Sequence, residues 1–306
     1  MNQMNTQNPL LCDPDSGVCE LPVVDGEMAE VEKASEKNIK IMYFTDPICS
    51  SCWGIEPQLR KLKLEYGNEI QIDYHMGGLL PDWSYNSGGI SKPSDVAGHW
   101  DEVSAYYKMP IDGDVWLEDP LSSSYPPSIA FKAAQIQNKK KALKFLRTIR
   151  EMVFLEKKNI CKWEHIKTAA IANGLDADKL KTDMDAEGKL SFESDLKLSR
   201  SLGVRGFPTL MFTDSTGKTE IIYGFRPYQQ FEQTLKKLKS DISKQTYDKS
   251  AEGLFKLYSS LTLQEFMTLS EMSEVESLKT LSSLTEKKIL SELKTKNGSL
   301  WRKIAE

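Results

Sequence analysis

The pattern of hydrophobic and polar positions first becomes regular near residue 39. Residues 39–44 form a short run rich in β-formers, which predicts a mostly buried strand. From residue 55 hydrophobic side chains recur at helical spacing as far as Gly67, and residues 70–74 then alternate as a second strand. The opening of the ordered chain is therefore predicted to be a strand, a helix and a second strand.

The middle of the chain has helical periodicity, and strand patterns return only after it. Hydrophobic residues recur at helical spacing in residues 128–137, 139–154, 163–173 and 176–186. Strands are expected at residues 209–212 and 221–224, with a turn between them, and an amphipathic helix over 228–242. Two halves of one α/β unit are thus separated by a helical insertion.

Residues 245–306 have a third kind of pattern. Short helical patterns cover residues 265–272, 273–284 and 286–293. Gly298 then marks a hairpin turn that leads to Trp301. We expect a small winged-helix-like module. Its basic and acidic side chains are about equal in number, which favours an interaction module over a DNA-binding one.

The bulk composition narrows the classes of function. The chain has 306 residues, 40% hydrophobic and 27% charged, with a formal net charge of −4. This balance gives no electrostatic reason to bind nucleic acid or an anionic membrane. The N-terminus lacks the basic start and apolar run of a secretory signal, and no stretch reaches the ~18 apolar residues of a membrane-spanning helix. We expect a cytoplasmic protein with no nucleic-acid or membrane partner.

Five cysteines supply the candidate chemistry. A reducing cytosol keeps most thiols reduced, so a close pair is more often catalytic, redox-sensing or metal-binding than structural. Cys49 and Cys52 have CxxC spacing between the first strand and the first helix. A zinc site would need two more ligands at fitting spacing, and the other cysteines and histidines are distant or scattered. We therefore favour a redox pair over a zinc half-site, with no metal and no cofactor.

The junction between strand and helix suits a reactive thiol. Only a thiolate attacks a disulfide, and the unpaired N–H groups and positive dipole of a helix start favour an anion at Cys49. Cys52, one turn further on, is placed to resolve the mixed disulfide. Neither Ser50 nor Ser51 is a histidine, so we expect a less oxidising couple than a pair with a histidine between its cysteines.

Residues 43–53, with residues 203–209 far downstream, resemble the DsbA-like branch of the thioredoxin superfamily. They are similar in particular to the FrnE-like and cytosolic DsbA-family dithiol–disulfide oxidoreductases, whose thioredoxin fold is interrupted by a helical domain. The resemblance implies that Pro208 is a cis-proline beside the cysteines and that the backbone of Phe207 pairs with a substrate chain. Trp53 is a further candidate for the substrate groove, with core packing as the alternative.

With this resemblance the patterns predict an α/β protein. Its fold class is a thioredoxin fold with a large helical insertion, plus a small C-terminal helical, winged-helix-like module. The expected parts are a flexible N-terminal tail over residues 1–38, a thioredoxin-like domain over 39–80 and 200–243, an inserted helical domain over 81–199, and an interaction module over 245–306.

A second likeness involves three separate stretches. Residues 49–57, 112–123 and 298–301 resemble the SpxH (YjbH) adaptor family. Members of that family deliver a transcription regulator to the ClpXP protease, so the resemblance implies docking, with the dithiol as sensor or relic. The N-terminal tail departs from the family pattern, because no histidine accompanies Cys12 and Cys19. Metal sensing by the tail is therefore in doubt.

Several single residues remain open to two interpretations. Cys12 and Cys19 enclose a turn and are either a second redox pair or incidental thiols. Cys161 is expected to be a small buried hydrophobe. Many thioredoxin-like enzymes hold a buried acid six residues before the first cysteine, where this chain has Tyr43. Glu56 is either a substitute proton carrier or a solvated surface residue.

Two functions follow from these observations. The first is a cytoplasmic thiol–disulfide oxidoreductase or isomerase, which acts on protein thiols and disulfides through Cys49 and Cys52. The alternative is an SpxH-like adaptor that docks a regulator or protease partner through residues 245–306, with the dithiol as redox sensor. A glutathione-using transferase or isomerase is a weaker third possibility. Such an enzyme would need only a single nucleophile, so the presence of two cysteines in a CxxC pair argues against it.

Overall fold

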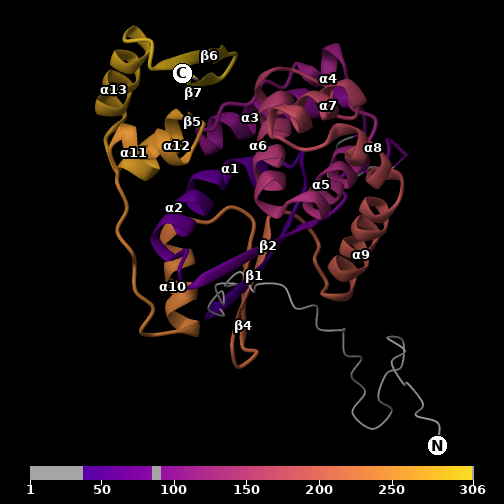
Figure 1. The fold of residues 1–306 in the computed structure, drawn as a ribbon, viewed down its shortest axis with the longest axis horizontal. Helices are drawn as coiled ribbons and strands as arrows, with labels where there is room; N and C mark the ends of the chain where they lie inside the picture. The colour runs from indigo at the N-terminus through magenta and orange to yellow at the C-terminus, as the bar shows by residue number, and fades with distance from the viewer. Residues whose placement is uncertain (1–36, 85–90, 305–306) are drawn as a thin grey trace, which may run out of the picture. The chain divides into compact units, whose positions relative to one another are not determined.

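A four-stranded sheet joins two segments that lie far apart in the sequence. The computed structural model describes residues 37–84 and 91–304. The strand order is β2-β1-β3-β4 (Figure 1). β1 (Ile39–Thr45) runs parallel to β2 (Ile70–Met76) and antiparallel to β3 (Thr209–Asp214), which pairs with β4 (Thr219–Tyr223). The predicted tail and its Cys12 and Cys19 lie outside the described residues, apart from residues 37–38.

β1 is the inner strand that positions the cysteine pair. It is paired on both sides, and Ile39, Ile41 and Tyr43 are completely buried, which accounts for its hydrophobic run. Helices α1 (Ser50–Gly54) and α2 (Glu56–Tyr66) follow it, and α10 (Tyr228–Leu238) follows β4. This is the predicted thioredoxin fold, in which the chain leaves the end of β1 directly into the CxxC turn.

The helices between β2 and β3 share one hydrophobic core with the sheet, because buried residues of β1, α2, α5 and α6 form a single cluster. The predicted helices at 128–186 correspond to α5–α8, whereas α3 and α9 were not predicted individually. α9 buries few apolar side chains, so its sequence pattern is weak. None of the helices in the described part of the chain has the length and apolarity to cross a membrane. The inserted helices are α3 (Pro93–Tyr107), α4 (Val115–Glu118), α5 (Tyr125–Gln137), α6 (Lys139–Leu155), α7 (Trp163–Ala172), α8 (Ala177–Asp185) and α9 (Glu187–Ser201).

The C-terminal module has its own core and its own sheet, with the strand order β5-β7-β6. Leu254, Phe266, Leu281 and Trp301 belong to a second buried cluster, whereas Leu300 belongs to the main core. The module is therefore packed against the rest of the protein. Its elements are α11 (Ala251–Leu257), β5 (Ser260–Thr262), α12 (Leu263–Ser270), α13 (Glu274–Glu286), β6 (Leu290–Thr295) and β7 (Gly298–Lys303).

The helix predicted over residues 286–293 is wrong, because β6 begins at Leu290 and pairs with β7. Leu290 and Leu293 have helical spacing, but in a strand they point to opposite faces. Leu290 is buried in the core of the module, and Leu293 packs against the main core. Because β6 packs against a core on each of its two faces, its hydrophobic residues fall at a spacing that resembles that of a helix. The domain boundaries of the sequence analysis stay a prediction.

Candidate redox site

Cys49 and Cys52 are joined in a disulfide, with their Cα atoms 5.1 Å apart. Cys49 is the N-cap residue of α1, and its sulfur accepts a hydrogen bond from the backbone N–H of Cys52 at 3.1 Å. The backbone N–H of Cys49 donates to the carbonyl oxygen of Asp46 at 3.2 Å, which closes the turn after β1. The predicted place of the pair, at the start of a helix directly after a strand, is what the structure has.

Cys49 is the outer cysteine of the pair. It is 3% exposed and Cys52 is fully buried. Cys49 lines a cavity of about 680 Å³, which we call the redox cavity, together with Gly77, Trp83, Trp100 and Phe207. A substrate sulfur that enters this cavity meets Cys49 before it can meet Cys52.

Phe207 lines the redox cavity with Cys49, and Pro208 follows it in the chain. The peptide bond between them is cis. The ring of Phe207 lies directly over Gly77, where any side chain would collide with it. The N–H of Gly77 donates to the carbonyl oxygen of Thr45 at 2.7 Å. Glycine at this position therefore lets Phe207 reach the redox cavity beside the end of β1.

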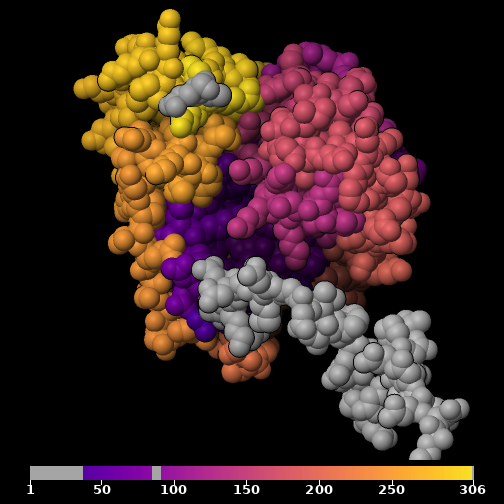
Figure 2. All heavy atoms as spheres, in the orientation of Figure 1, coloured from indigo at the N-terminus to yellow at the C-terminus, as the bar shows by residue number. Residues whose placement is uncertain are grey.

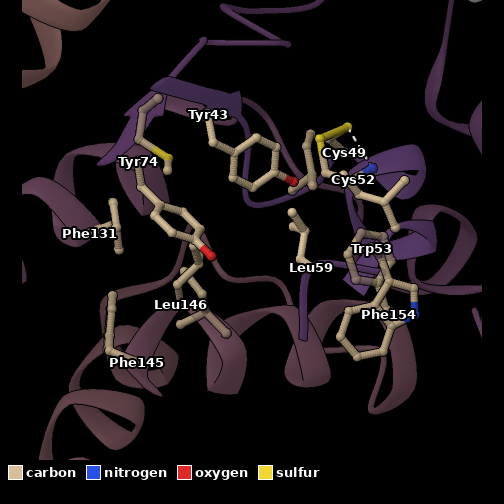
Figure 3. Packing of buried hydrophobic residues seen from close by; sticks show 14 of the residues in the cluster. Tyr43, Cys49, Cys52, Trp53, Leu59, Tyr74, Phe131, Phe145, Leu146 and Phe154 are labelled. Atoms are coloured by element: carbon tan, nitrogen blue, oxygen red, sulfur yellow. Dashed lines mark hydrogen bonds between the residues drawn. A yellow bond between two sulfur atoms is a disulfide. The ribbon is translucent and has the colours of Figure 1, made fainter. Parts of the chain in front are cut away.

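Trp53 does not line the redox cavity. Its side chain is completely buried, and its indole N–H donates to the carbonyl oxygen of Pro110 at 3.0 Å. The ring stacks on Phe154 and carries the guanidinium of Arg147 at 4.3 Å from its centroid. Figure 3 shows the side chain directed away from the disulfide into the core. The core-packing alternative therefore describes Trp53, because its side chain leaves the helix on the face opposite the cavity.

A buried carboxyl group that the sequence analysis missed precedes the pair. Asp46 is completely buried and accepts hydrogen bonds from the N–H groups of Ile48 (3.0 Å) and Leu79 (2.8 Å) and from the hydroxyl of Ser124 (2.8 Å). Burial raises the pKa of Asp46 to about 6, although these hydrogen bonds oppose the rise. In the sequence, an Asp-Pro pair just before CxxC indicates a turn and gives no sign that the carboxyl group is buried. Its carboxyl group is a candidate proton carrier in the loop that holds Cys49.

Two further residues concern proton transfer: Tyr43, which stands in place of the usual buried acid, and Glu56, the substitute considered from the sequence. Tyr43 is completely buried, and burial raises its pKa further above neutrality. Glu56 is not a solvated residue, because Arg150 donates to its carboxylate at 2.6 Å. The same guanidinium donates to the hydroxyl of Thr45 at 2.6 Å and to the carbonyl oxygen of Asp46 at 3.2 Å. Glu56 and Arg150 thus fix the end of β1.

Cys161 is only partly buried, rather than a wholly buried hydrophobe. Its thiol donates to the carbonyl oxygen of Ser123 at 2.8 Å. Burial raises the pKa of the Cys161 thiol, which disfavours the reactive thiolate. Within residues 37–84 and 91–304 the reactive sulfur chemistry therefore belongs to Cys49 and Cys52.

The sheet and the CxxC turn define a protein of thioredoxin fold, and a helical insertion separates the two halves of its sheet. A family model described as Thioredoxin matches residues 42–233. The cytosolic disulfide reductase DsbM from Pseudomonas aeruginosa has a similar structure, with a TM-score of 0.53 and 21% sequence identity. That likeness covers 65% of this chain and 99% of DsbM, and at this identity it shows the fold alone.

Two relatives match almost the entire chain. The ClpXP adapter protein SpxH of Halalkalibacterium halodurans is 32% identical over 302 residues, which is 97% of this chain and 98% of that protein. SpxH of Shouchella clausii is 30% identical over 95% of this chain and 96% of its own length. The chain therefore belongs to the thioredoxin family and, within it, to the SpxH family.

Proposed function

We propose that this protein is an adaptor, which binds a client regulator and presents it to the ClpXP protease. The extent of the similarity carries the proposal. The thioredoxin match ends at residue 233 and the DsbM likeness covers 65% of the chain, whereas the SpxH of H. halodurans matches 97% of it. The C-terminal module lies beyond the thioredoxin match, in the part of the chain that these named adapters also cover.

Buried charges hold this module against the thioredoxin-like part. Glu265 of α12 is completely buried, and its carboxylate accepts two hydrogen bonds from the guanidinium of Arg147 on α6, at 2.7 and 3.0 Å. Arg60 of α2 lies 3.2 Å from the same carboxylate. Ion pairs of this kind support a docking surface with a fixed geometry, because separating them would leave buried charges unpaired.

The β6–β7 turn makes a second contact. Lys296 pairs with Asp101 at 2.7 Å and with Asp114 at 2.9 Å. The side-chain amide of Asn297 donates to the carbonyl oxygen of Ile111 at 2.8 Å. Two of the stretches that carry the SpxH likeness, residues 112–123 and 298–301, thus belong to segments that meet in space. This contact supports a shared adaptor architecture.

We propose thiol–disulfide exchange as a second activity, because Cys49 occupies a helix N-cap and faces the redox cavity. In the reduced protein the Cys49 thiolate attacks a substrate disulfide, forms a mixed disulfide and releases one substrate thiolate. The Cys52 thiolate then attacks the Cys49 sulfur and releases the second substrate thiolate. The substrate gains two electrons and, from solvent, two protons, and the pair becomes the disulfide seen in the structure. Both functions agree with the expected cytoplasmic location.

Two assays on one set of proteins separate these functions. The first assay measures how fast ClpX and ClpP of the source organism degrade a client. The client is that organism's own version of the regulator that SpxH adapters deliver. The second follows insulin reduction with dithiothreitol as the thiol donor. We expect the wild-type chain and Cys49→Ser to accelerate degradation equally, and only the wild type to accelerate insulin reduction.

Each function has its own refuting result. The adaptor proposal fails if the folded wild-type chain does not shorten the client half-life. The exchange proposal fails if the wild type does not reduce insulin, or if Cys49→Ser reduces it equally fast. Cys161→Ser is the matched control, because it removes a thiol outside the CxxC pair.

A further inference from the structure

A second cavity lies between the thioredoxin-like part and the C-terminal module. Its volume is about 670 Å³, and it is lined from α2, α6, α11 and the end of β7. It shares no lining residue with the redox cavity. Figure 2 looks into this hollow, with indigo α2 in its floor, orange α11 on one side and magenta α6 on the other. We call it the lysine cavity, for the residues described next.

Four lysines line this cavity, and burial lowers the pKa of one of them, Lys63. The cavity also has three arginines, but the carboxylates of Glu56, Glu151 and Glu265 lie against them. The lining lysines have no carboxylate within ion-pair distance in the described parts of the chain. The four are Lys63, Lys144, Lys256 and Lys303. Such a concentration of cations is unexpected in a chain whose net charge is −4.

Two of the lining side chains, Lys63 (partly buried) and Arg150 (buried), can each donate to a further acceptor. The ammonium of Lys63 donates to the hydroxyl of Tyr74 at 2.7 Å, and burial lowers the pKa of this lysine. Arg150 is 1% exposed, and its Nε–H has no hydrogen-bond partner among the residues that the structure describes. A buried donor without an acceptor destabilises the fold. An oxyanion in the cavity would supply acceptors for such donors.

We propose that the lysine cavity binds a compact phosphate polyanion, such as the diphosphate group of a small metabolite. A cavity of this size suits a small ligand. The terminal phosphate of a diphosphate group carries roughly −1.5 to −2 charges and the inner phosphate carries about one more, so the group matches the three exposed lysines in a small volume. Carboxylates carry one charge each, so several of them would be needed there. Lysine ammonium groups also suit phosphate oxygens, because they act as point charges without a fixed plane.

The ligand also connects the two parts of the protein. Lys63 and Lys144 come from α2 and α6, whereas Lys256 and Lys303 come from the C-terminal module. A polyanion that contacts both pairs binds only while the module is docked, so it stabilises the docked state by mass action. The ligand would bind at the junction between the thioredoxin-like part and the C-terminal module, whether or not the protein acts as an adaptor.

Calorimetric titration of the full chain with sodium pyrophosphate tests the proposal. The test variant combines Lys144→Gln, Lys256→Gln and Lys303→Gln. The matched control combines Lys139→Gln, Lys236→Gln and Lys279→Gln, which removes three exposed lysines outside the cavity. We expect one saturable site, weakened about tenfold or more in the test variant and within about twofold of wild type in the control. Circular dichroism melting of all three proteins shows that they are folded.

Three results would overturn the proposal. They are the absence of saturable pyrophosphate binding, unchanged affinity in the test variant, and equal weakening in the control, which would indicate net charge alone. A glutamate-rich peptide serves as the competing probe. If it binds more tightly than pyrophosphate and loses affinity only in the test variant, the cavity takes an acidic chain and the phosphate assignment is wrong.

Discussion

The substitution Glu265→Gln tests how strongly buried charge holds the C-terminal module. Glu265 is the third residue of α12 and belongs to a capping box, in which its carboxylate accepts a hydrogen bond from the backbone N–H of Thr262 at 2.8 Å. Glutamine is also accepted at this capping position, so the helix start is retained. What the substitution removes is the negative charge between Arg147 and Arg60.

The expected cost follows from the remaining partners of the two arginines. Breaking a buried ion pair by removing one charge costs about 3–5 kcal/mol. Arg147 keeps Glu151 at 2.7 Å, and Arg60 keeps the carbonyl oxygen of Ser260 at 2.9 Å. We therefore expect the lower end of that range, about 3 kcal/mol of lost unfolding free energy.

Urea unfolding followed by circular dichroism at pH 7 measures this loss. Glu274→Gln is the matched control, because Glu274 is exposed in the same module and has no ion pair among the described residues. It should change the unfolding free energy by less than about 0.5 kcal/mol. Hydrogen exchange in Glu265→Gln should accelerate first in β5, β6 and β7, because the module loses its contact with α6.

The pH dependence provides an independent check. Burial would raise the pKa of Glu265, but the guanidiniums of Arg147 and Arg60 outweigh it and lower the pKa below the ordinary 4.5. A lowered carboxyl pKa stabilises the fold above the unfolded value, and this contribution is lost as the pH falls through the folded value. The difference between wild type and Glu265→Gln should therefore shrink below about pH 4.5. A difference under about 0.5 kcal/mol at pH 7, equal to that of the control, would refute the role of this network.

Two further substitutions test other buried polar groups. Ser277→Ala should raise the unfolding free energy by about 1 kcal/mol in urea titration, because the Ser277 hydroxyl is buried on α13 with no hydrogen-bond partner in residues 37–84 and 91–304, and because alanine is a better helix former. A loss of stability would contradict this reasoning. Asp46→Asn removes a group whose pKa rises from 3.8 to about 6, a change that corresponds to about 3 kcal/mol. The unfolding free energy of the wild type relative to Asp46→Asn should therefore fall by up to about 3 kcal/mol between pH 4 and 6 and then stay level. If this difference in unfolding free energy is constant from pH 4 to 7, the raised pKa is wrong.

The elements next to the cysteine pair could be predicted because their signals are local. A β-rich run, a proline turn and helical periodicity follow one another within residues 39–66, so strand, CxxC and helix appear in the right order. The same holds for α5–α8, whose apolar residues repeat along one face. The resemblance around residues 49–57 and 203–209 likewise rests on short stretches, and Phe207 of the second stretch lines the redox cavity.

Only the tertiary structure decided which polar groups are buried and what they contact. Asp46 meets Ser124, 78 residues away, and Glu265 meets Arg147, 118 residues away. Trp53 turned out to be core because α6 supplies Phe154 and Arg147 on that face, and β6 is a strand because β7 pairs with it. Periodicity records how often a side chain is apolar. It does not record which distant segment covers that side chain, and burial, pKa and ion pairing depend on that segment.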